Sequence, residues 1–232
     1  MKNKTGVLFG RLMRHILRSP DTIITVAIVP IMMLLLFTYV LGGSLVGSIQ
    51  TSGAVKVSYV NYQLPGILLM AISSGIAYTA MRLFTDTQKG LFARFNSMPI
   101  KRSSALWAHV MASLVSNMLT VVLIFLVALL IGFRSSAGIL EWLMVAGILA
   151  LFTLALTWVA VIPGLTAKSV EGATSFSYPL IFLPFISSAF VPTKTMPSVV
   201  RAFAENQPVT SIVESVRSLL NSTRSEERRV GK

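Results

Sequence analysis

Long apolar runs separated by short polar segments dominate the chain. A helix needs about 20 apolar residues to cross the hydrocarbon core of a bilayer. Runs of that order cover 22–41, 64–81, 105–133 and 139–162, and a shorter one covers 176–191. Pro179 and Pro184 interrupt the last run, and such breaks persist in a membrane only where protein or a cavity satisfies the freed backbone groups. The pattern predicts an all-α, polytopic membrane protein with about five transmembrane helices.

The leader, residues 1–21, predicts an amphipathic helix lying in the membrane interface. Its apolar face carries Phe9, Leu12, Met13 and Ile16, and its basic face carries Arg11, Arg14 and Arg18. Such a helix binds the interface with its apolar face toward the lipid. Because short isolated helices are marginally stable, a solvated basic leader without a helix is the alternative. The run 22–41 is too long for a secretory signal, so we expect it to be a retained span.

Basic residues predict the orientation. The chain contains 20 Lys and Arg against 8 Asp and Glu, and the leader and the segment 82–104 carry most of the basic residues that flank the spans. Loops rich in Lys and Arg stay in the cytoplasm, so we expect the N-terminus there. The basic residues form short clusters between apolar runs, a distribution that does not predict a nucleic acid partner.

The sequence offers few groups for chemistry. The only Gly-Lys pair is Gly231-Lys232, so no phosphate-binding loop is present, and the chain has no cysteine. His15 and His109 have no carboxylate or second histidine at ligand spacing, and we therefore predict no metal site and no catalytic residue. We expect His109, which follows Trp107, to be an interfacial polar anchor, with a proton carrier as the alternative.

Polar residues recur at helical spacing in the run 105–133. They are Ser113, Ser116, Asn117 and Thr120. Small and polar side chains of this kind hold transmembrane helices together. We predict that this set packs against neighbouring helices.

Two motifs resemble a known family. Between the second and third runs, Asp86, Gly90, Arg94, Ser97, Pro99 and Arg102 occur in an order that resembles the inner loop of type 2 ATP-binding-cassette (ABC) exporter permeases, particularly the daunorubicin-resistance branch. After the fifth run, Phe190-Val-Pro192, Met196-Pro197 and Asn206-Gln-Pro208-Val-Thr210 lead into a helix through Arg217 to Leu220, which resembles the outer segment of the same family. Together with the basic leader and the order of the spans, the resemblance covers residues 1–223.

The inner segment would dock an ATPase if the resemblance holds. Leu91, Phe92 and Phe95 offer an apolar edge beside basic side chains, and Pro99 ends the element. In the resembled family this segment is the coupling helix, which sits in a groove of the ATPase subunit. The expected ATPase-coupling residues are Lys89, Gly90, Leu91, Phe92, Arg94, Phe95 and Pro99. A helix resting on lipid headgroups is the alternative.

The resemblance implies the membrane subunit of an ATP-driven exporter in the plasma (inner) membrane of a prokaryote. Two separate ATPase subunits would hold ATP and Mg²⁺, a second permease copy would complete a homo- or heterodimer, and this chain itself would bind no cofactor and hydrolyse nothing. The cargo would be a drug, lipid or glycan-like molecule. Substrate contacts are expected at Met70, Ser73, Ser74 and Tyr78, for which ordinary helix packing is the alternative.

Two other functions stay open at this stage. An ion-coupled secondary transporter would be expected to have an inverted repeat and a charge at the membrane midplane, and we find neither in the sequence. A non-transporting membrane assembly or scaffold protein would need no ATPase. The neighbouring gene would separate the three, because an exporter of this family is expected beside a reading frame with a phosphate loop.

The predicted permease domain, 1–223, consists of the leader, the spans over 22–191 and an outer re-entrant helical segment over 192–223. Residues 224–232 change abruptly to mostly charged side chains and resemble the translated opening of a short-read sequencing adapter. We expect them to be an artefact, with a genuine charged tail as the alternative. The family has a sixth span, which is missing here, so the natural chain is expected to continue beyond Thr223.

Overall fold

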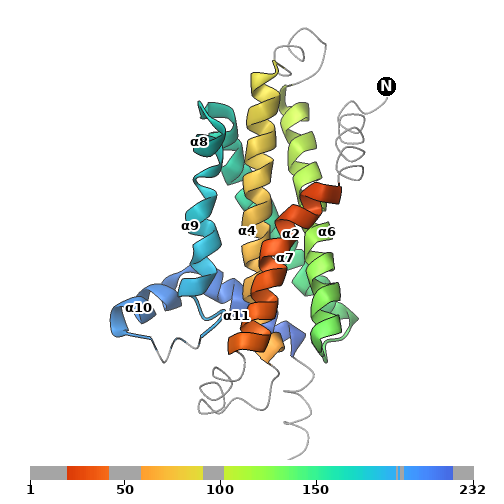
Figure 1. The fold of residues 1–232 in the computed structure, drawn as a ribbon, viewed down its shortest axis with the longest axis vertical. Coiled ribbons are helices and arrows are strands. Elements are labelled where there is room, and N and C mark those ends of the chain that lie inside the picture. The colour runs from red at the N-terminus through yellow and green to blue at the C-terminus, as the bar shows by residue number, and fades with distance from the viewer. Residues whose placement is uncertain (1–19, 42–58, 91–101, 192, 194–195, 222–232) are drawn as a thin grey trace, which may run out of the picture. The chain divides into compact units, whose positions relative to one another are not determined.

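The computed structural model describes residues 20–41, 59–90, 102–191, 193 and 196–221 (Figure 1). Helices and short links account for these residues, and no strand occurs among them. The all-α prediction is therefore confirmed. Residues 1–19 of the predicted leader and the charged tail 224–232 lie outside the described residues.

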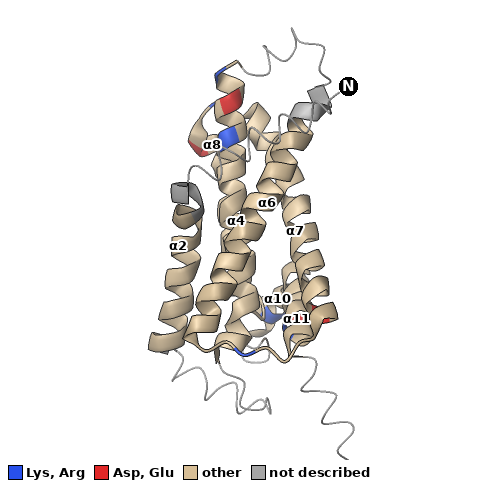
Figure 2. Ribbon diagram, turned by 90° about the vertical axis from the view of Figure 1, so that its right-hand side faces the viewer, with Lys and Arg blue, Asp and Glu red and all other residues tan. Residues whose placement is uncertain are grey.

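Four of the predicted spans coincide with long helices. They are α2 (Pro20–Leu36), which continues as the π-helical turn η1 (Phe37–Leu41), α4 (Tyr59–Gln88), α6 (Arg102–Ile131) and α7 (Ile139–Thr166). In the described part of the chain, α4, residues 106–131 of α6, and α7 are long and apolar enough to cross a membrane, while α2 and η1 contribute a shorter apolar helix, Ile24–Val40. Charged residues gather near the ends of the long helices, whose middle lengths are uncharged (Figure 2).

The fifth run does not form one continuous helix. The short helix α8 (Val170–Thr174) precedes it, and the run itself contains α9 (Ser177–Phe182) and the 3-10 turn η2 (Leu183–Ile186). Pro184 stands at the start of η2, where its missing N–H interrupts the ladder of backbone hydrogen bonds. The interruption expected from the prolines is thus present, and the crossing of a bilayer by this stretch stays a prediction.

The outer segment predicted over 192–223 contains two further helices, α10 (Ser198–Asn206) and α11 (Pro208–Leu220). The apolar side of α11 is buried, since Val213 and Val216 are 0% exposed and Leu220 is 1% exposed. Glu214 points to the exposed side. The helix α11 is therefore amphipathic, and the re-entry of this segment into a membrane stays a prediction.

The chain divides into two compact units. The first unit comprises residues 1–27, 71–121 and 150–180, and the second comprises 28–70, 122–149 and 181–232. In the first unit, Leu83 of α4, Val110 of α6 and Val161 of α7 form a buried apolar cluster. A Cβ at Gly164 of α7 would lie 3.0 Å from a methyl group of Leu83, so this glycine allows α7 to approach α4 closely.

Aromatic stacking and a glycine-ended helix characterise the second unit. The rings of Phe37 and Phe185 lie 4.8 Å and 4.9 Å from that of Phe190. The helix α6 is followed directly by Gly132, whose φ is +114°. Phe133 N–H donates to the carbonyl of Ala128. This is the Schellman pattern that satisfies the last carbonyls of a helix. The chain then reverses into α7.

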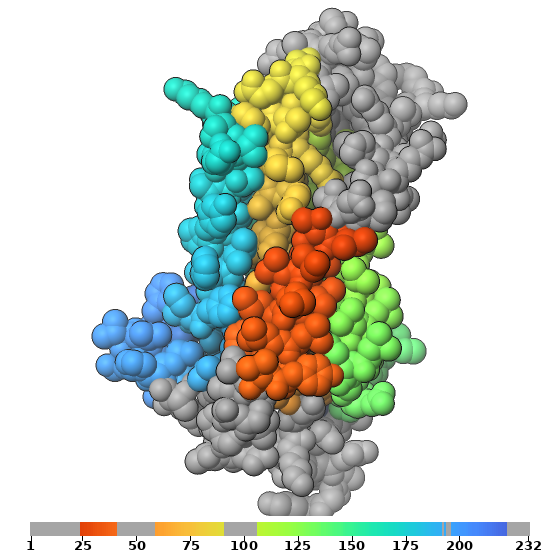
Figure 3. Space-filling model, viewed as in Figure 1, coloured from red at the N-terminus to blue at the C-terminus, as the bar shows by residue number. Residues whose placement is uncertain are grey.

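Large apolar side chains also lie on the surface. The helix α2 can be seen on the face of the molecule in Figure 3, and its part in the second unit exposes Val29, Met32 and Leu36. The part of α7 in the same unit exposes Leu140 and Leu143. Exposed apolar surface on long apolar helices is what a bilayer covers.

Candidate functional site

Polar side chains join three helices in the first unit. The hydroxyls of Thr79 on α4 and Ser113 on α6 lie 2.7 Å apart, and that of Thr157 on α7 lies 3.3 Å from Ser113. All three side chains are buried. One turn along α6, the Asn117 amide donates to the Ser113 carbonyl at 3.0 Å and lies against Gly75 of α4. The predicted helix-packing role is therefore confirmed for Ser113 and Asn117.

A third contact extends this line of polar groups. Asp86 Oδ2 on α4 lies 3.3 Å from His109 Nε2 on α6, and the two side chains are only 26% and 12% exposed. The sequence shows no carboxylate at ligand spacing from His109, but the antiparallel packing of α4 and α6 brings Asp86, which is far from it in sequence, into contact with it. We call this line the polar seam: Gly75, Thr79 and Asp86 on α4, and His109, Ser113 and Asn117 on α6.

The predicted ATPase-coupling residues begin directly after the seam. Lys89 is exposed and Gly90 has a φ of +68°, a conformation that favours glycine. Lys89 N–H and Gly90 N–H donate to the carbonyls of Thr85 and Thr87, so α4 ends here with a glycine cap. The other predicted coupling residues, Leu91, Phe92, Arg94, Phe95 and Pro99, lie outside the described residues.

The predicted substrate-contact residues lie along α4. Met70, in the second unit, is 2% exposed, and Ser73, in the first, is 1% exposed. Ser74 and Tyr78 are half-buried and stand one helical turn apart. The burial of Met70 and Ser73 within the chain fits helix packing, and substrate contact at the four positions stays a prediction.

In the second unit, Arg217 anchors α11. Its guanidinium lies 3.8 Å above the ring of Tyr62 on α4 and donates to the Tyr62 carbonyl at 3.1 and 3.2 Å. It also donates to the carbonyls of Ser188 at 2.7 Å and Ala189 at 3.2 Å. Burial lowers the pKa of the Arg217 guanidinium from its ordinary value, but arginine keeps its charge in proteins. The motif that leads into this helix included Arg217, but nothing in the sequence indicated these carbonyl partners.

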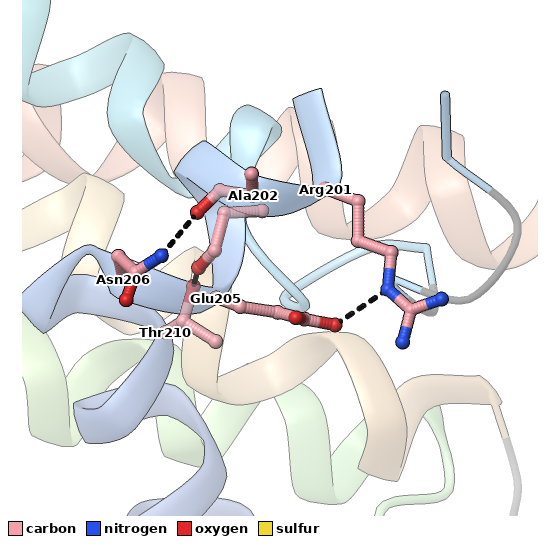
Figure 4. Close-up of polar contacts among 6 residues, drawn as sticks. Arg201, Ala202, Glu205, Asn206 and Thr210 are labelled. Atoms are coloured by element: carbon pink, nitrogen blue, oxygen red, sulfur yellow. Dashed lines mark hydrogen bonds and ion pairs between the residues drawn. The ribbon is translucent and has the colours of Figure 1, made fainter. Parts of the chain in front are cut away.

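The corner between α10 and α11 is also fixed by hydrogen bonds. Thr210 Oγ1 donates to the Ala204 carbonyl at 2.5 Å, and Gln207 Nε2 donates to the Ile186 carbonyl at 2.8 Å. Figure 4 shows the contact of Thr210 together with the bond from Asn206 to the Ala202 carbonyl and the ion pair between Arg201 and Glu205. The corner therefore holds α10 in a defined direction relative to α11.

Among the described residues, no group of three or more His, Cys, Asp or Glu side chains lies close enough together to hold a metal ion.

Comparison with known proteins identifies the family. The model of the ABC-2 type transporter family matches residues 3–221. The chain belongs to this family. This permease is 27% identical over 208 residues to a daunorubicin resistance ABC transporter permease protein of Streptomyces coeruleorubidus, an alignment that covers 88% of the permease and 70% of the relative. It is 25% identical over 211 residues to a probable doxorubicin resistance ABC transporter permease protein of Mycobacterium tuberculosis, covering 90% and 73%.

The family and these relatives confirm the resemblance drawn from the sequence, including its daunorubicin-resistance-like branch. The permease is a multi-pass membrane protein, and it is the transmembrane component of an ABC transporter rather than its ATPase. Membership of an ABC transporter implies an ATPase partner.

Proposed function

We propose that the permease is the membrane subunit of an ATP-driven exporter that moves a drug, lipid or glycan-like molecule out of the cytoplasm. The family match over residues 3–221 carries this proposal. The names of the relatives, which refer to daunorubicin and doxorubicin resistance, favour an amphipathic cargo. Since the sequence has no phosphate-binding loop, ATP and Mg²⁺ bind a separate ATPase subunit.

The complete transporter contains two permease copies and two ATPase subunits in the plasma membrane of a prokaryote, with the N-terminus of each permease in the cytoplasm. The segment from Lys89 to Pro99 docks each ATPase through Phe92 and Phe95. The exposed Lys89 and the glycine cap of α4 support this assignment, because α4 ends directly before the residues assigned to docking.

The cargo passes along α4 in this proposal. Ser74 and Tyr78 offer a hydroxyl and an aromatic ring on one face of the helix, a combination that suits an amphipathic molecule. Met70 and Ser73 lie on the same helix and would join this path only through a rearrangement of the packing that buries them.

Co-purification tests the docking. The permease is expressed with the ATPase encoded beside its gene, and the double variant Phe92→Asp, Phe95→Asp is expected to lose the ATPase because two charges replace its apolar contact. Phe203→Asp is the matched control, since Phe203 is an exposed phenylalanine on α10 and should keep the ATPase. Equal recovery of ATPase with the double variant would contradict the docking assignment, and no recovery with the unmodified permease would contradict the exporter.

A further inference from the structure

Asp86 and His109 flank the docking segment in the sequence, one before it and the other after it. Asp86 is in the last turn of α4, and His109 is near the start of α6. The chain between these helices contains the residues proposed to dock the ATPase. The side chains of the pair therefore connect α4 and α6, the two helices that a displacement of that segment would move.

The rest of the polar seam keeps α4 and α6 in one register. Thr79 and Ser113 share a hydrogen bond of 2.7 Å, and the Asn117 amide fills the space that a side chain at Gly75 would occupy. Helices that interlock through such discrete contacts resist sliding, because each contact must break before the next register can form. The seam thus holds α4 against α6 at three levels, from the end of α4 to about three turns inside it, with the apolar residues Leu83 and Val110 between the first two levels.

The chemistry of the pair suits a clamp. The Nε2–H group of the imidazole can donate a hydrogen bond to the carboxylate, both in the neutral tautomer that carries hydrogen on this atom and in the charged form. Both side chains are mostly buried. Removal of either one would leave the other as a buried polar group without this partner, which is the costly arrangement.

We propose that Asp86 and His109 are positioning residues that clamp α4 to α6, so that the two helices move as one rigid pair when the ATPase displaces the segment between them. Without the clamp, the ends of α4 and α6 next to the docking segment separate. The displacement of that segment then does not reach the membrane-spanning parts of the two helices. This inference rests on the proposed function, because it needs an ATPase that docks on the segment.

A distance measurement tests the clamp. The chain has no cysteine, so Gln88→Cys and Met111→Cys place two spin labels at exposed positions of α4 and α6. The distance between the labels is measured by pulsed electron paramagnetic resonance in the complete complex with its ATPase, both without nucleotide and after trapping with ATP and vanadate. With the clamp intact, we expect the same mean distance in both states. With Asp86→Ala or His109→Ala, we expect trapping to shift and broaden the distance distribution.

Two further variants separate the clamp from a general loss of stability. His109→Gln keeps an N–H donor and should restore a distance that does not change on trapping. Thr85→Ala, whose hydroxyl bonds only the Met81 carbonyl of its own helix among the contacts described, should behave like the unmodified chain. A shift with the clamp intact, or no shift in the alanine variants, would overturn the clamp. Failure of the unmodified complex to trap nucleotide would instead count against the proposed function.

Discussion

The side-chain amide of Asn117 on α6 lies directly against the backbone of Gly75 on α4. A Cβ at position 75 would overlap the Asn117 amide oxygen. We therefore expect Gly75→Ala to displace the buried Asn117 side chain from its place between α4 and α6 and to destabilise the permease by about 1–3 kcal/mol, the usual cost of overpacking. A lower midpoint of thermal unfolding in detergent would show this.

Gly147→Ala is the matched control. A Cβ at Gly147 of α7 meets nothing within 4 Å, and alanine is the better helix former, so this variant should unfold at the same temperature or slightly higher. The double variant Gly75→Ala, Asn117→Ala removes the amide and should recover part of the loss. Equal unfolding temperatures for Gly75→Ala and the unmodified chain would show that α4 and α6 do not pack this closely.

The hydroxyls of Thr79 and Ser113 should contribute a small but measurable coupling. Polar contacts between transmembrane helices average about 0.6 kcal/mol in double-mutant cycles. We expect a coupling of that order from Thr79→Val, Ser113→Ala and the double variant, measured from their free energies of unfolding. A coupling of zero would indicate that the 2.7 Å contact adds nothing beyond packing.

Loss of Arg217 should destabilise the second unit. Arg217→Ala removes every donor that the guanidinium offers to the carbonyls of Tyr62, Ser188 and Ala189, at a cost of about 2 kcal/mol or more. Arg217→Lys should recover little, because an ammonium group cannot reproduce the planar fork or the stacking on Tyr62. Thermal unfolding of the purified permease measures both variants.

Arg201→Ala provides the control for Arg217. The ion pair between Arg201 and Glu205 is exposed, with side chains 47% and 45% accessible, and such pairs contribute about 0–1 kcal/mol. The unfolding temperature should therefore change little. If Arg201→Ala and Arg217→Ala lowered the unfolding temperature equally, the interpretation of Arg217 as a buried anchor of α11 would be wrong.

Gly90 should matter for docking through its backbone. Its φ of +68° is unfavourable for a residue with a Cβ by about 1–2 kcal/mol. Gly90→Ala should redirect the chain that leaves α4 in the unbound permease, which releases the strain there. If binding of the ATPase restores about 1.4 kcal/mol of this strain, the affinity for the ATPase should fall roughly tenfold. Titration of the ATPase against permease in nanodiscs measures the change, and an unaltered affinity would show that the glycine cap is dispensable.

Long apolar runs made most of the fold predictable. The runs over 22–41, 64–81, 105–133 and 139–162 all became helices, because only a helix satisfies the backbone of such a segment within lipid. The fifth run was less predictable, since Pro179 and Pro184 weaken the helix without determining where each short piece begins and ends.

The polar contacts were predictable only in part. Ser113 and Asn117 stand at helical spacing, and this pattern correctly indicated contact with other helices. Asp86 and His109 belong to different helices, so no spacing in the sequence relates them, and the partners of Arg217 are backbone carbonyls, which every residue possesses. Such contacts follow from the packing register, which hydrophobic patterns leave open.

Transport in inverted membrane vesicles tests the central claim most directly, with daunorubicin as the probe and its fluorescence quenching as the signal. Vesicles that contain both the permease and its ATPase should accumulate daunorubicin only when ATP is supplied, and those with either protein alone should accumulate none. Accumulation driven by an imposed proton gradient without ATP would contradict an ATP-driven exporter, and absence of accumulation with both proteins and ATP would contradict daunorubicin as its cargo.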